Sequence, residues 1–134
     1  SNLFARLAHL DFHISGARDQ NKVIRCAAPR RSFAYLLSLL DEIRFYGKSD
    51  LQINYRLIRF YGDLGAVLKR LKKEDHILAI LAQLEQCLVC ARKNFEENSK
   101  ERKSLEKAYQ HSLSMIRTSS KATIASDEFM EQDL

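Results

Sequence analysis

Hydrophobic positions recur at alternating spacings of three and four residues from residue 33 to residue 116. This period is typical of amphipathic helices that bury one face. The first stripe predicts a helix over about 32–46, with Ser32 as its N-cap after Pro29, and it consists of Phe33, Leu36, Leu40 and Ile43. The second predicts a helix over about 50–71 and consists of Ile53, Leu57, Phe60, Leu64, Val67 and Leu71.

Two further stripes follow. The third predicts a helix over about 73–97 and consists of Ile77, Leu81, Leu84, Leu88, Ala91 and Phe95. The fourth is thinner, predicts a helix over about 99–117, and consists of Leu105, Ala108 or Tyr109, Leu113 and Ile116. Stripes of this length predict helices that pack at small crossing angles.

Short polar breaks separate the predicted helices. Gly47 is expected to end the first helix in a left-handed conformation, and Ser49-Asp50-Leu51-Gln52 has the form of a capping box. Asn98-Ser99-Lys100-Glu101 is a second capping-box candidate. Connections this short predict antiparallel neighbours. Gly62 and Gly65 lie inside the second helix, where the unbroken stripe predicts close packing or a mild kink rather than a helix end.

The two ends of the chain have different patterns. Short β-rich runs around a loop with Gly16 predict a hairpin over about 11–28. The last residues, 118–134, are small and acidic and predict a disordered tail. The sequence therefore predicts a mainly α fold, an antiparallel bundle of three to four helices with a small N-terminal β-hairpin, as one domain over 1–117.

Composition limits the class of protein. The 134 residues are 46% hydrophobic and 29% charged, as in soluble globular domains, and no apolar run approaches the roughly 20 residues of a membrane span. Three cysteines, an odd number, indicate reduced thiols and a cytosolic setting rather than a disulfide framework.

Charge is uneven along the chain, although the net charge is only +5. The first 126 residues hold all 22 basic residues and all but four of the 17 acidic ones, a net charge of +9. Arginine suits phosphate and carboxylate groups, so the candidate ligand-binding residues are Arg30, Arg31, Arg44, Arg56 and Arg59. The cluster from Lys69 to Lys73 is a candidate contact for an anionic lipid surface. The alternative is that these charges only solvate helix faces.

Other motifs favour structural interpretations. Cys87 and Cys90 have C-x-x-C spacing but lie mid-helix, so we interpret them as two small buried side chains. His9 and His13 lack the helical context of a metal pair. The pentapeptide 43–47 recurs at 58–62, which we interpret as chance. No catalytic constellation, metal site or cofactor motif is recognisable, and we do not expect an enzyme.

One resemblance extends over about residues 22–95. The elements Pro29-Arg30-Arg31-Ser32-Phe33, then 41–47 (DEIRFYG), then 56–59 (RLIR), resemble a bacterial family of predicted integral-membrane proteins. It is number twenty-two fifty-four among the domains of unknown function. The resemblance implies a C-terminal fragment of an inner-membrane protein, with this part cytoplasmic. The family's preceding S-P-G-I-N-D-P element is missing here, and the family supplies no catalytic residues.

Two functional hypotheses follow. The first is a non-catalytic cytoplasmic domain of a membrane protein that self-associates or regulates the membrane region, its partners being a second copy and that region. The alternative is a binder of an anionic ligand through a basic helical face, with nucleic acid a less favoured partner than an anionic lipid surface.

Overall fold

A computed structural model of the chain describes residues 33–119. They form four helices: α3 (Phe33–Tyr46), α4 (Leu51–Arg70), α5 (Glu74–Asn94) and α6 (Lys100–Thr118). The described part contains no strand, and the prediction of a mainly α fold is confirmed. The hairpin predicted over about 11–28 lies outside the described residues. Of the tail predicted over 118–134, only Thr118, the last residue of α6, and Ser119, its C-cap, are described.

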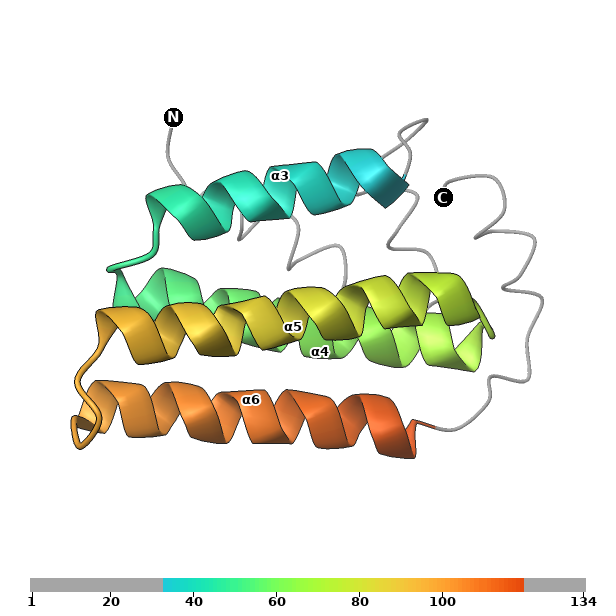
Figure 1. Ribbon diagram of the computed structural model, residues 1–134. Coiled ribbons are helices and arrows are strands. Elements are labelled where there is room, and N and C mark those ends of the chain that lie inside the picture. The colour runs from blue at the N-terminus through green and yellow to red at the C-terminus, as the bar shows by residue number, and fades with distance from the viewer. Residues whose placement is uncertain (1–32, 120–134) are drawn as a thin grey trace.

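Consecutive helices run in opposite directions, so α3 and α5 end at one end of the molecule, where α4 and α6 begin (Figure 1). Helix α4 is central and contacts each of the other three, most extensively α6 and least α3. None of the four described helices has the length and apolarity that a membrane crossing requires.

The central position of α4 is visible in its burial. Every residue from Phe60 to Leu68 is buried, including the polar Asp63. The helix therefore has no solvent-facing side over this stretch, and it forms the middle of the core.

Two glycines allow α6 to lie close against α4. A Cβ atom on Gly62 would lie 2.9 Å from the Cα of Ser112, and one on Gly65 would lie 2.5 Å from Cδ1 of Ile116. Ser112 is fully buried, and its hydroxyl donates to the carbonyl of Ile58 at 3.0 Å. The predicted close packing at the two glycines is observed, and it is the α4–α6 contact.

The predicted stripes hold in full on two helices, because each position of the first two stripes is buried. On α6 Leu105, Ala108 and Ile116 are buried as predicted, but Leu113 is only half-buried and Ser112 is buried in its place. The stripe on α5 is different, because Leu81 and Leu88 are only half-buried. Its buried positions are Ile77, Ile80, Leu84, Cys87, Cys90 and Ala91.

Helices α4 and α6 begin one residue later than their predicted capping boxes imply. Asp50, not Ser49, is the N-cap of α4, and its carboxylate accepts from the Ile53 N–H at 3.0 Å. Ser99 caps α6 by accepting from the Arg102 N–H at 3.1 Å. Asp and Ser are both strong N-caps, so the local pattern alone did not separate neighbouring candidates. Helix α5, expected to reach Glu97, ends at Asn94.

The left-handed residue is not Gly47, because no described glycine has a positive φ. Gly47 is needed for space: a Cβ there would lie 2.4 Å from Cγ2 of Ile53. Instead Lys72 has φ 59°, where it ends α4. The N–H of Lys73 donates to the Leu68 carbonyl and that of Lys72 to the Lys69 carbonyl, the two bonds of a Schellman motif.

Candidate anion-binding pocket

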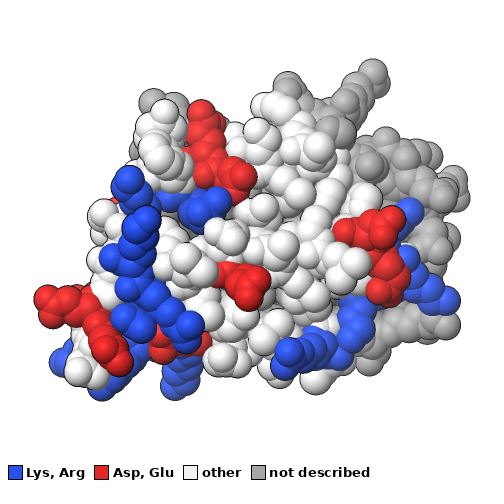
Figure 2. Space-filling view, in the orientation of Figure 1, with Lys and Arg blue, Asp and Glu red and all other residues white. Residues whose placement is uncertain are grey.

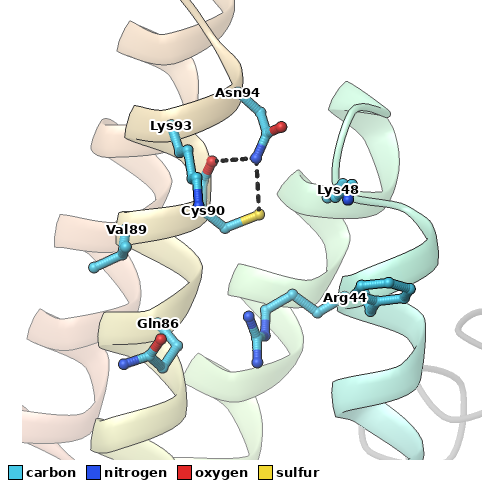
Figure 3. Close-up of a pocket in the computed structure, with 8 residues that line it drawn as sticks. Arg44, Lys48, Gln86, Val89, Cys90, Lys93 and Asn94 are labelled. Carbon is cyan, nitrogen blue, oxygen red and sulfur yellow. Dashed lines mark hydrogen bonds between the residues drawn. The ribbon is translucent and has the colours of Figure 1, made fainter.

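A hollow of about 280 Å³ lies between the C-terminal ends of α3 and α5 (Figure 3). Three of its lining residues are cationic, and none is a carboxylate. The lining consists of Arg44, Phe45, Lys48, Gln86, Val89, Cys90, Lys93 and Asn94. Such a set suits a ligand that carries negative charge.

Arg44 comes from the last turn of α3 and extends into the gap toward α5 (Figure 3). Its Nη2 donates to Asp41 Oδ1 at 2.8 Å, and its Nε has no hydrogen-bond partner. Burial alone lowers the pKa of Arg44, but the hydrogen bond and charge of Asp41, with smaller effects of Cys87 and Tyr61, outweigh it and the pKa is raised. The guanidinium is therefore a fixed, permanently charged donor with N–H groups to spare.

The two lysines lie at the rim of the pocket. Lys48 lies two residues after the end of α3, and its Nζ lies 4.8 Å from the centre of the Phe45 ring, which also lines the pocket. Lys93 comes from the last turn of α5. Both are exposed, so their attraction for an anion is screened by salt more than that of Arg44.

The wall from α5 carries a thiol and an amide. Cys90 directs its sulfur into the gap, and Asn94 Nδ2 lies 3.5 Å from that sulfur and donates to the Cys90 carbonyl at 2.8 Å (Figure 3). One turn earlier Cys87 is fully buried, and burial raises the pKa of its thiol. Both cysteines are buried, as the C-x-x-C interpretation predicted.

Helix direction explains why cations collect at this end. Arg44, Arg92 and Lys93 all lie in last turns, where a basic side chain compensates the negative end of the helix dipole. Figure 2 shows basic atoms running down this end of the molecule from α3 toward α6. Compensation of the helix dipole thus accounts for the basic residue types at this end. The hollow between α3 and α5 is bordered by several of these cations at once, so they can contact the same anion.

A second basic hollow, of about 300 Å³, lies between α4 and α6. Arg59 contributes to it and donates through Nη1 to the Tyr55 hydroxyl at 3.2 Å. Lys107 and His111 complete its charged or titratable lining. With two permanent cations rather than three, it suits an anion less well than the first pocket.

The described arginines among those predicted as ligand-binding residues do not form one site. Arg44 lines the pocket between α3 and α5, and Arg59 lines the second hollow. Arg56 is exposed on α4 and lines neither. Arg30 and Arg31 lie outside the described residues. In the cluster from Lys69 to Lys73, Lys69 donates to the Arg117 carbonyl at the end of α6.

Sequence reasoning missed Lys48 and Lys93. The available signal was their position, since each lies at the C-terminal end of a helix and alternate helices of an up-and-down bundle end together. Among residues 33–119, no group of three or more His, Cys, Asp or Glu side chains is placed to hold a metal ion.

Comparison of the chain with known protein families, with curated proteins and with solved structures found no match. The resemblance of the sequence elements between residues 29 and 59 to a membrane-protein family therefore stays a prediction.

Proposed function

We propose that this chain is a non-catalytic helical domain that binds an anionic group in the pocket between α3 and α5. The observation that carries the proposal is the meeting of Arg44, Lys48 and Lys93 on one hollow whose lining contains no carboxylate. Arg44 supplies fixed donors, and the two lysines attract the anion and close the rim. The ligand class is a phosphate or a carboxylate, which guanidinium groups bind well.

Calorimetric titration with inorganic phosphate at low salt tests this proposal. Saturable binding is expected, and Arg44→Gln should weaken it at least about tenfold, because a charged hydrogen bond is lost. Arg56→Gln is the matched control, since Arg56 is an exposed arginine outside the pocket. The proposal fails if the unmodified chain does not bind saturably, or if the two variants bind alike.

A second candidate function is self-association, as the regulatory part of a longer bacterial membrane protein. Two large apolar side chains on α5 favour it, because Leu78 is 64% and Val89 52% exposed. The membrane location and the cytoplasmic position of this part depend on the motif resemblance alone. Sedimentation over a range of protein concentrations tests the self-association, and a strict monomer at millimolar concentration excludes it.

A further inference from the structure

The outward face of α5 carries a stripe of its own. Its members recur at spacings of three and four residues, and all are exposed, opposite to the buried stripe of the same helix. The seam stripe consists of Asp75, Leu78, Ala82, Glu85, Val89 and Arg92. A helix with two such faces can pack against its own domain on one and against a second helix on the other.

Residues of the seam stripe that lie at equal distances from its centre have complementary side chains. An antiparallel second α5, related by a two-fold axis passing between residues 83 and 84, brings Asp75 opposite Arg92 and Leu78 opposite Val89. Beside the stripe, the same axis brings Glu74 opposite Lys93. Figure 2 shows this polarity, with acidic atoms toward one end of the α5 face, basic atoms toward the other, and acidic atoms also in the middle of an otherwise uncharged stretch.

We infer that α5 packs antiparallel against α5 of a second copy through the seam stripe, with the acidic start of each helix on the basic end of the other. This inference rests on the second proposed function, self-association, and names its surface and register. A two-fold contact needs a patch that complements itself, and these residues meet that requirement at both charged ends and at the apolar positions.

The charged and apolar parts of the seam have different roles. Leu78 and Val89 exclude water at two symmetric points, and the flanking ion pairs fix direction and register. Arg92 also forms an ion pair within its own copy, its Nε lying 3.0 Å from Glu106 Oε2, but a guanidinium has further N–H groups for Asp75 of a second copy. With two large apolar residues per copy, the contact lies at the small end of stable interfaces.

Glu85 is the unfavourable member of the seam. It falls opposite Ala82 near the two-fold axis, where the two copies of Glu85 approach each other. Replacing it with glutamine removes this repulsion without changing the shape of the side chain, so Glu85→Gln should tighten the dimer severalfold.

Charge reversal on the full chain tests the register. Asp75→Arg alone and Arg92→Asp alone should each weaken dimerisation about tenfold in sedimentation equilibrium, because each reversal turns two attractive pairs into repulsive ones. The two changes together restore opposite charges across the axis and should recover the original affinity. Lys103→Asp, on an exposed part of α6, is the control for a change in net charge.

Three results distinguish the possibilities. Weakening by both single variants with recovery in the double variant supports the inference. A dimer that neither single reversal weakens more than the control overturns this surface and leaves self-association standing. A chain that stays monomeric at millimolar concentration overturns both. None of these variants replaces a residue that lines the pocket, but Val89 and Lys93 belong to both surfaces. The phosphate titration is therefore carried out at concentrations where each chain is monomeric, which makes it an independent result, and circular dichroism of each variant establishes that it is folded.

Discussion

Replacing Gly62 with alanine tests the packing on which the whole bundle depends. The added Cβ would lie 2.5 Å from Oγ, 2.6 Å from Cβ and 2.9 Å from Cα of Ser112. Because one of these atoms is backbone, a side-chain rotation cannot relieve the clash, and α4 and α6 must separate. Overpacking of a core costs about 1–3 kcal/mol, and this contact belongs at the upper end.

Two further effects contribute to the change in the free energy of unfolding caused by Gly62→Ala. Moving Ser112 disturbs its buried hydrogen bond to the Ile58 carbonyl, at a cost of about 1–2 kcal/mol, whereas alanine is favoured over glycine inside a helix by about 1 kcal/mol. The net expectation is a loss of about 3–4 kcal/mol in the free energy of unfolding. Urea denaturation followed by far-ultraviolet circular dichroism measures it.

Gly65→Ala is the matched control on the same helix. There the nearest atoms are Cδ1 and Cγ1 of Ile116, at 2.5 and 2.7 Å, and both belong to a side chain that can change rotamer. The same gain in helix propensity applies, so the loss should be no more than about 1 kcal/mol. Equal losses for the two variants, or a Gly62→Ala chain as stable as the original, would refute the reasoning that backbone approach governs this contact.

Three other predictions follow from single residues. Tyr61→Phe should leave stability within about 0.5 kcal/mol or raise it, because the buried hydroxyl of Tyr61 has no hydrogen-bond partner; a loss above about 1 kcal/mol in urea denaturation would contradict this. Lys72→Gly should raise stability by roughly 0.5–1 kcal/mol, since it removes a left-handed non-glycine residue, and a lower melting temperature would count against it. Burial and Lys73 lower the pKa of His76 from 6.5, so the unfolded chain takes up the proton first, and stability should decline as pH falls below 6.5. His76→Phe, which retains a ring to stack on Phe33, should flatten that decline, and an unchanged pH profile would exclude His76 as its source.

The buried face of α5 shows why helix content was predictable and helix orientation was not. Ile80 and Leu81 are adjacent and both apolar, as are Cys87 and Leu88, so two overlapping stripes fit the same period. The positions of α4 and α6 around α5 determine which of the two stripes is buried. These positions depend on the sequences of α4 and α6, and the sequence of α5 does not contain them. The structure selects the stripe with Ile80 and Cys87, and this choice turns Leu78 and Val89 outward.

The membership of the pocket also depends on how the helices are arranged. An arginine-rich composition indicated affinity for anions, but Arg44 and Arg59 lie on different helices and face different gaps. What gathers Arg44, Lys48 and Lys93 is the antiparallel course of the chain, which brings two helix ends together. A list of basic residues predicts the chemistry of such a site, and only the arrangement of the helices determines its members.

The repeated pentapeptide IRFYG shows that identical residues differ in exposure according to the helices around them. At 43–47 its two aromatic residues, Phe45 and Tyr46, are 59% and 67% exposed, whereas at 58–62 Phe60 and Tyr61 are fully buried. The first copy ends a helix that is covered on one side, and the second lies in the middle of the central helix. Both copies still end in a glycine that a neighbour approaches closely, Ile53 in one case and Ser112 in the other. Local sequence therefore determines that these residues are helical and where the backbone needs space, while the neighbouring helices determine which side chains reach solvent and are free to bind.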